Sequence, residues 1–324
     1  MKESDIRPNE IFDEFLLLAS KDILKYFSEP GEIICCPACD AKGDHAFTKD
    51  KFSYRECASC KTLFVSPRPS EESFSRYYQE SESSKYWAST FYKATADARR
   101  EKLWKPKVQL IHDILIKYGS ELYDLVDIGG GFGIFGEEYE KAYGKRVFII
   151  EPGPDLAKAC REKGLEVIQS FMEDITHEQL SDGPKNFVSF ELFEHLYDPK
   201  KFLTHLFHLM KSGDLFIFTT LSGVGVDIRV LWENSKSVSP PHHLNFFNPK
   251  SIRLLLNRIG FEVLQTSTPG KLDIDIMSNN TQFVNDRFWK TFLYQATQEE
   301  KTAMQILIAE CGLSSHMLTV CRKP

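Results

Sequence analysis

Hydrophobic and polar positions follow two periods along the second part of the chain. From Leu122 onward, short apolar or alternating runs typical of strands are separated by segments with helical periodicity. The strand-like runs are YDLVDI, RVFII, LEVIQ, NFVSFEL and DLFIFTT, and the helical segments include GIFGEEYEKAYG, PDLAKACREKG and DPKKFLTHLFHLMKSG. This β/α alternation predicts a parallel sheet with helices on both faces and a ligand site at the carboxyl ends of the strands.

Two further runs complete the predicted sheet. FEVLQTSTPG reads as a sixth strand and SSHMLTVCRK as a closing one, which predicts an α/β, doubly wound, Rossmann-like sheet of seven strands with the last antiparallel. An inserted segment at about 270–312 is predicted to be mostly helical, as a lid over a substrate pocket or a subunit contact. Most of its aromatic side chains are expected to be core: Phe283, Phe288, Trp289, Phe292 and Tyr294.

The first part of the chain divides by pattern into shorter modules. Apolar residues at helical spacing over 9–28 predict a lead-in helix, and 90–118 reads as a helix with its Lys and Arg on the outer face. The predicted boundaries are an N-terminal helix at 1–30, a zinc ribbon at 31–66, a helical linker or cap at 67–118 and the main domain at 119–324.

Four of the eight cysteines form two Cys-x-x-Cys pairs, CPAC and CASC, separated by 17 residues. Each tight turn can point two sulfurs at one tetrahedral ion, so Cys36, Cys39, Cys57 and Cys60 are predicted to bind a structural zinc ion. With four thiolates the ion has no open position for water. Two disulfides or four unrelated thiols are the alternatives.

Composition and charge limit the class of partner. The 324 residues are 42% hydrophobic, enough for a main core plus a smaller module, and the formal charge of -6 is spread among interspersed acids and bases. That charge makes a nucleic-acid partner unexpected. No apolar run approaches the roughly 18 residues of a membrane span, so we expect a soluble, cytoplasmic protein without a membrane partner.

A glycine-rich turn follows the first predicted strand, in LYDLVDIGGGFGIFG at 122–136. Glycines allow a tight strand-to-helix turn and let a ligand approach the backbone N–H groups. The GxGxxG that starts at Gly131, with Glu151 20 residues later, matches the dinucleotide fingerprint and favours NAD. Asp127 favours a cationic ligand, because a bound diphosphate would repel its carboxylate. S-adenosylmethionine, with a sulfonium, an ammonium and no phosphate, fits that second interpretation.

Four runs in order, over about 200 residues, resemble class I S-adenosylmethionine-dependent methyltransferases. They are DIGGGFG, IIEPGPDLAKACREKGLEV, FELFEHLYDPKKFLTHLFHLMKSGDLFIFTT and HHLNFFNPKSIRLLLNRIGFEV. Together with an N-terminal four-cysteine ribbon, they are similar to bacterial methyltransferases that act on nucleotide-linked sugars or polysaccharide precursors. The resemblance implies transfer of a methyl group from S-adenosylmethionine, most often to a hydroxyl of a sugar, nucleotide sugar, glycan or other small molecule.

The resemblance also implies a set of cofactor-binding residues. Glu151 would hold the ribose, and Phe171 and Met172 would flank the adenine unless they are core residues. Ser170 stands where family members often carry an acid that binds the adenine amino group. The whole set is Asp127, Gly129, Gly130, Gly131, Glu151, Phe171, Met172 and Glu191.

Candidate catalytic residues come from two places. After the fourth strand, the resemblance places Glu194 and His195 beside the methyl-transfer site, where they face the substrate or cap a helix. The long connection LSGVGVDIRVLWENSKSVSPPHHLNFFNPKSI holds His242 and His243. Sugar C-methyltransferases with a similar zinc module have Tyr-x-Glu-His here, and only His243 matches, which argues against C-methylation. We expect His243 to be the base, the alternative being that it anchors the loop.

Other functions stay open at this point. The glycine fingerprint allows an NAD-dependent enzyme, and the ribbon allows an RNA or protein methyltransferase docked through it, which predicts a basic face near the ribbon. A catalytically silent scaffold would be favoured by loss of Asp127 or Glu151, and both are present.

Overall fold

A computed structural model describes residues 2–324, and Met1 of the predicted segment 1–30 lies outside them. The chain forms two compact units. The ribbon unit holds residues up to 98, 221–252 and 267–317, and the sheet unit holds 99–220, 253–266 and 318–324. The predicted main domain, 119–324, contributes residues to both.

The sheet unit is built on seven strands in the order β10-β11-β8-β7-β4-β5-β6. They are β4 (Asp124–Ile128), β5 (Val147–Ile150), β6 (Glu166–Ile168), β7 (Lys185–Phe190), β8 (Leu215–Leu221), β10 (Glu262–Ser267) and β11 (His316–Arg322). Strands β4 to β8 pair in parallel, and β11 is antiparallel, so the predicted fold class is confirmed. Because β4 lies between β5 and β7, the strand order reverses at its carboxyl end, where open α/β sheets bind ligands.

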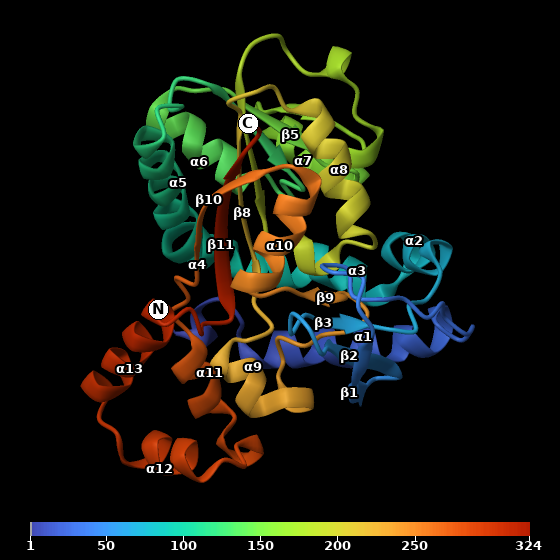
Figure 1. The fold of residues 1–324 in the computed structure, drawn as a ribbon, viewed down its shortest axis with the longest axis vertical. Helices are drawn as coiled ribbons and strands as arrows, with labels where there is room; N and C mark the ends of the chain where they lie inside the picture. The colour runs from blue at the N-terminus through green and yellow to red at the C-terminus, as the bar shows by residue number, and fades with distance from the viewer. Residues whose placement is uncertain (1) are drawn as a thin grey trace. The chain divides into compact units, whose positions relative to one another are not determined.

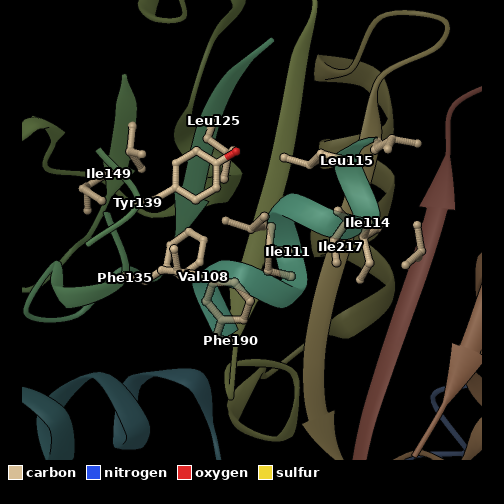
Figure 2. Close-up of a cluster of buried hydrophobic side chains, with 14 of the residues drawn as sticks. Val108, Ile111, Ile114, Leu115, Leu125, Phe135, Tyr139, Ile149, Phe190 and Ile217 are labelled. Carbon is tan, nitrogen blue, oxygen red and sulfur yellow. The ribbon is translucent and has the colours of Figure 1, made fainter. Parts of the chain in front are cut away.

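Helices cover both faces of this sheet (Figure 1). They are α5 (Lys105–Lys117), α6 (Ile134–Tyr143), α7 (Pro154–Glu162), α8 (Pro199–Leu209) and α10 (Pro249–Ile259), whereas α4 (Tyr92–Arg99) belongs almost wholly to the ribbon unit. On one face, apolar side chains of α5 and α6, among them Ile111 and Phe135, pack with Leu125 and Ile149 of the strands (Figure 2). Burial of this apolar layer is the main force that holds α5 and α6 against the sheet.

The opposite face carries an aromatic layer. Phe216 and Phe218 of β8 alternate with Leu215 and Ile217, which belong to the first face. Phe218 stacks on Phe193 with 4.3 Å between ring centroids, and Phe193 meets Phe202 of α8 edge to face. The period of two along β8 thus explains an uninterrupted apolar run, since both sides of the strand are buried.

The ribbon unit contains a four-stranded sheet in the order β1-β2-β3-β9. Its strands are β1 (Gly43–Lys49), β2 (Phe52–Cys57), β3 (Leu63–Val65) and β9 (Asn245–Phe246). The β1–β2 hairpin turns through Asp50 and Lys51, both with positive φ, which suits a two-residue hairpin loop. Strand β9 was not predicted: it comes from the long connection after β8 and pairs antiparallel with β3.

Helices make up the rest of the ribbon unit. They are α1 (Asn9–Tyr26), α2 (Glu71–Glu80), α3 (Glu82–Tyr86), α9 (Val226–Leu231), α11 (Asp273–Asn279), α12 (Arg287–Gln295) and α13 (Gln298–Glu310), with π-helical turns at Trp87–Phe91 and, in the sheet unit, Arg100–Trp104. None of the helices in residues 2–324 is long and apolar enough to cross a membrane.

The inserted segment is helical, but its aromatic residues are mostly not core. Phe283, Phe288 and Tyr294 are exposed, Tyr294 at 90%. Only Trp289 and Phe292 pack, partly buried, against the apolar cluster of the insert. The prediction was wrong for three of the five. Phe288 and Tyr294 lie on the face of α12 that is turned to solvent, and Phe283 ends a separate 3-10 turn, Thr281–Phe283.

A pair of buried acids joins the insert to α9. Asp273 accepts hydrogen bonds from the Ser314 hydroxyl (2.5 Å), the Ser315 N–H (2.7 Å) and the Gln305 amide (2.7 Å). Asp227, fully buried, has a pKa raised well above its usual value by burial and then by the Asp273 carboxylate. The fold therefore favours the protonated form of Asp227.

We expect Asp227→Asn to raise the melting temperature, most strongly at high pH. Because the folded protein binds the Asp227 proton more tightly than the unfolded chain, the stability this group contributes is present near pH 4 and is lost as pH rises toward its folded-state pKa. Asn stays neutral, so its advantage should grow by at most about 1.4 kcal/mol per pH unit. Thermal unfolding between pH 4 and pH 9 measures it, with the exposed Asp44→Asn as control; a pH-independent difference would contradict the account.

Candidate functional site

The glycine turn follows β4 directly. Asp127 is 2% exposed near the end of that strand, and Gly129 and Gly131 have φ of +72° and +57°. A Cβ on Gly130 would lie 2.7 Å from Ile149 Cγ2 and 3.1 Å from Asp127 Oδ2. The left-handed backbone and the close approach of β5 explain why the turn carries glycines.

Glu151 lies directly after β5 and holds the same turn. Its two carboxylate oxygens accept hydrogen bonds from the N–H groups of Gly131 and Gly153, both at 2.9 Å. The side chain is 6% exposed, and burial raises its pKa against the opposing effect of these two N–H groups. Glu151 is thus a buried acid tied to the backbone of the turn.

Two neighbouring buried acids make this end of the sheet a site for positive charge. Burial, and then the Glu151 carboxylate, raise the pKa of Asp127 to about 7, while the Lys107 ammonium lowers it. Two carboxylates in a water-poor environment repel each other, so a cation placed between them would be favoured and a diphosphate would not.

Lys107 was missed by the sequence analysis. The pattern predicted the basic residues of 90–118 on the outer face, but the Lys107 side chain is only 13% exposed. Its ammonium lies 3.4 Å from a Glu191 carboxylate oxygen and 3.2 Å from the Thr219 hydroxyl. It also lies over the rings of Trp104 and Phe190, and burial lowers its pKa. The one sequence feature that indicated burial of Lys107 was its place on the helix, next to Val108 and four residues before Ile111, both of which are buried.

The candidate residues after β7 form a second acidic group. Glu191 has φ of +53°, unusual for a non-glycine residue, and accepts a 2.7 Å hydrogen bond from Thr219. Glu194 is 2% exposed and accepts a 2.8 Å hydrogen bond from Thr220. Burial, and then the Glu191 carboxylate, raise the pKa of Glu194 to about 8. His195 follows it and is half-buried.

The two candidate adenine neighbours differ in environment. Phe171 is 62% exposed, whereas Met172 is 3% exposed and begins a short 3-10 helix, Met172–Asp174. Phe171 is therefore available to a ligand, and Met172 belongs to the core.

The histidines of the long connection lie in the ribbon unit. His243 Nδ1 is 2.6 Å from the Ser237 carbonyl oxygen. A carbonyl only accepts, so Nδ1 carries the proton and, in the neutral ring, Nε2 is the basic nitrogen. His242 Nε2 is 2.8 Å from the hydroxyl of the buried Tyr77, which also meets Ser83 at 2.8 Å. Tyr77 is a second residue that sequence reasoning missed, since tyrosine in a polar helical stretch carries no distinctive pattern.

The four ribbon cysteines come together as their spacing predicted. Their sulfurs lie within 4.8 Å of one another, with Cys36–Cys60, Cys39–Cys57 and Cys39–Cys60 at 3.5, 3.4 and 3.5 Å. These distances are far beyond a disulfide of about 2.05 Å. They are close to the edge of about 3.8 Å expected for four sulfurs around a tetrahedral ion with bonds of about 2.3 Å. The donor set and its geometry fit a zinc ion.

Comparison with known proteins places the chain in a family. A family model described as a methyltransferase domain matches residues 91–266, more than half of the chain. Malonyl-[acyl-carrier protein] O-methyltransferase 2 of Ilyobacter polytropus is 26% identical over 150 residues, or 44% of this chain. The match spans 57% of the length of that relative.

The structure of one solved methyltransferase agrees in fold. The plantazolicin methyltransferase BamL, in complex with a triazolic desmethylPZN analog and SAH, has a TM-score of 0.50 at 14% identity and covers 76% of this chain and 93% of its own. An S-adenosylmethionine-dependent methyltransferase from Clostridium acetobutylicum has a TM-score of 0.44 at 10% identity, covering 71% and 98%. The NAD-dependent alternative finds no support in these comparisons. The chain belongs to the methyltransferase domain family.

Proposed function

We propose that this enzyme transfers the methyl group of S-adenosylmethionine to a hydroxyl of a sugar, nucleotide sugar or other small-molecule or glycan acceptor. The observation that carries the proposal is the state of His243, whose Nδ1–H is bound to the Ser237 carbonyl at 2.6 Å, so that Nε2 is its basic nitrogen. A neutral imidazole with a defined tautomer suits removal of a hydroxyl proton at neutral pH.

The sheet unit supplies the cofactor site in this proposal. Asp127 and Glu151, the two buried acids at the glycine turn, bind the ammonium and the ribose hydroxyls, and Lys107 binds the carboxylate of the methionine part. Gly129, Gly130 and Gly131 keep the turn free of side chains, Phe171 covers the adenine, and Glu191 orients Lys107 through their 3.4 Å contact. The complementarity of one cation and two acids to a zwitterionic ligand supports these roles.

Methyl transfer requires few further groups from the protein. S-adenosylmethionine supplies a methyl group on a sulfonium, which is an excellent leaving group. The remaining work is to align the acceptor and to take its proton. His243 takes the proton in the proposal, while His242, which is hydrogen-bonded to Tyr77, positions the acceptor. Glu194 and His195 remain the alternative base, on the sheet unit.

The ribbon is proposed to hold one structural zinc ion through Cys36, Cys39, Cys57 and Cys60. All four donors are cysteine sulfurs, which leaves no position for a reacting water, so the metal stabilises the fold and takes no part in the transfer. About one zinc per purified chain is expected from metal analysis.

A screen with a methyl-labelled cofactor tests the proposed acceptor class. Purified enzyme would be incubated with labelled S-adenosylmethionine and separate panels of nucleotide sugars, glycans, small hydroxy compounds, RNA, protein and malonyl-acyl carrier protein. The last is included because the Ilyobacter relative is named for it. Labelled ether products in the sugar panels support the proposal. Label in RNA, protein or the malonyl carboxyl would overturn it.

The raised pKa of Asp127 predicts pH-dependent cofactor binding. A bound ammonium favours the ionised carboxylate, but below its pKa of about 7 the free enzyme holds the acid protonated. Affinity for S-adenosylhomocysteine should therefore fall by up to about tenfold per pH unit below pH 7. Titrations from pH 5.5 to pH 8.5 measure this. Asp127→Asn should remove the dependence, and Asp124→Asn, on the same strand and paired with Arg146 at the surface, should keep it; equal slopes in both variants would refute the role of Asp127.

A further inference from the structure

The connection after β8 is built into the ribbon sheet. Strand β9 pairs with β3, placing Leu63 opposite Phe246 and Phe64 opposite Asn245. The N–H of Val65 adds a 2.9 Å hydrogen bond to the Leu244 carbonyl. His243 therefore lies two residues before β9, a strand of the same sheet as the ribbon strands β1, β2 and β3.

Two buried side chains cross between the ribbon and the connection. The Tyr54 hydroxyl, on β2, donates a 2.8 Å hydrogen bond to the His243 carbonyl oxygen. The Asn248 amide donates a 2.8 Å hydrogen bond to the carbonyl of Cys60, one of the four clustered cysteines. Both side chains are buried, Tyr54 at 0% and Asn248 at 3% exposure, so the loss of either bond leaves a buried polar group without its partner.

Further contacts extend the attachment toward the start of the connection. Arg68 donates to the Asn245 side chain at 2.7 Å, and the Lys49 ammonium donates to the Ser235 carbonyl at 2.7 Å. Phe47 of β1 meets Trp232 edge to face at 4.9 Å between ring centroids. The connection thus follows the ribbon sheet from Trp232 to Asn248.

We propose that the four-cysteine ribbon is the support that positions the histidine loop, with Tyr54 and Asn248 as its two ties, so that metal binding orders residues 237–248. The inference rests on the proposed function for the zinc ion and for His243. Tyr54 and Asn248 are positioning residues: they act on the loop backbone through hydrogen bonds and touch no reacting atom. The proposed cofactor residues belong to the other compact unit, so the dependence on metal should be confined to the histidine loop.

Hydrogen–deuterium exchange of the full chain tests the proposal without an acceptor. Peptides covering 237–248 would be compared in zinc-loaded enzyme, in chelator-treated enzyme and in zinc-loaded variants. Tyr54→Phe removes one hydroxyl and keeps the ring that stacks on Phe47. Asn248→Asp keeps the side-chain oxygen that accepts from the Lys250 and Ser251 N–H groups at the start of α10, and removes the donor to Cys60. The exposed Tyr294→Phe and Asn257→Asp are matched controls.

The expected result is faster exchange of 237–248 by about fivefold or more in both zinc-loaded variants, the effect of about one buried hydrogen bond. Chelation should give a larger increase, while peptides over 125–133 keep their wild-type exchange. The proposal is overturned if the loop exchanges alike with and without zinc, or if both variants match their controls. If chelation also speeds exchange in α12 and α13, its effect is not specific to the loop, and the exchange of 237–248 in the two zinc-loaded variants then decides whether the proposal holds.

Zinc content and titration with S-adenosylhomocysteine, measured on the same samples, separate this inference from the proposed function. If the enzyme binds zinc and S-adenosylhomocysteine, but exchange of residues 237–248 changes neither on chelation nor in the two variants, only the positioning role is contradicted. Enzyme that binds no zinc contradicts the proposed metal site itself.

Discussion

His243→Ala is expected to lower methyl transfer to the acceptor found by screening by about 10²–10⁴-fold, the usual contribution of a general base. The ring would be lost together with the Nδ1–H bond to the Ser237 carbonyl that sets its tautomer. Because the proposed cofactor residues lie on other strands, affinity for S-adenosylhomocysteine should stay within about twofold. Initial rates at saturating cofactor, together with binding titrations, measure both effects.

Three variants make that result interpretable. His45→Ala removes an exposed histidine of the ribbon and should leave the rate unchanged. His242→Ala is expected to raise KM more than it lowers kcat, since His242 is tied to Tyr77 and is proposed to position the acceptor. Full turnover by His243→Ala together with its loss in His195→Ala would move the base to the residues after β7.

Glu151→Ala is expected to weaken binding of S-adenosylhomocysteine by about 100-fold or more. Two hydroxyl hydrogen bonds to a buried carboxylate would be lost, each contributing about 1.5–3 kcal/mol. The backbone N–H groups of Gly131 and Gly153, both held by this carboxylate, would lose their partner as well. Calorimetric titration measures the affinity, and thermal unfolding shows whether the turn remains folded.

The matched control is Glu162→Ala, an acid on α7 whose side chain is 66% exposed. Glu151→Gln should fall between wild type and Ala, because an amide can still accept from the backbone and pair with one hydroxyl. Unchanged affinity in Glu151→Ala would show that the ribose assignment is wrong.

Local pattern was sufficient for the sheet and for the cysteine cluster. The apolar runs before Asp127 and Glu151 are buried on both faces, and such strands differ clearly from the amphipathic helices between them. Cys-x-x-Cys turns likewise bring sulfurs together by local geometry, and the second pair arrives through an adjacent hairpin.

Long-range contacts escaped the sequence analysis. Strand β9 is two residues long and has no periodicity of its own, so its pairing with β3 depends on contacts across about 180 positions of sequence. Lys107 looks like a surface residue in the sequence because its ion-pair partner, Glu191, lies 84 positions away. Phe288 and Tyr294 show the opposite error: they were predicted to be core and are exposed, because large apolar residues are not always buried.

Parallel calorimetric titrations of wild-type enzyme and Glu151→Ala with S-adenosylhomocysteine and with NAD test the cofactor site. We expect saturable one-to-one binding of S-adenosylhomocysteine to wild type, at least about 100-fold weaker binding to the variant, and no binding of NAD. Binding of NAD by wild type, or equal affinity of both proteins for S-adenosylhomocysteine, would contradict the assignment of Asp127, Glu151 and the glycine turn as the cofactor site.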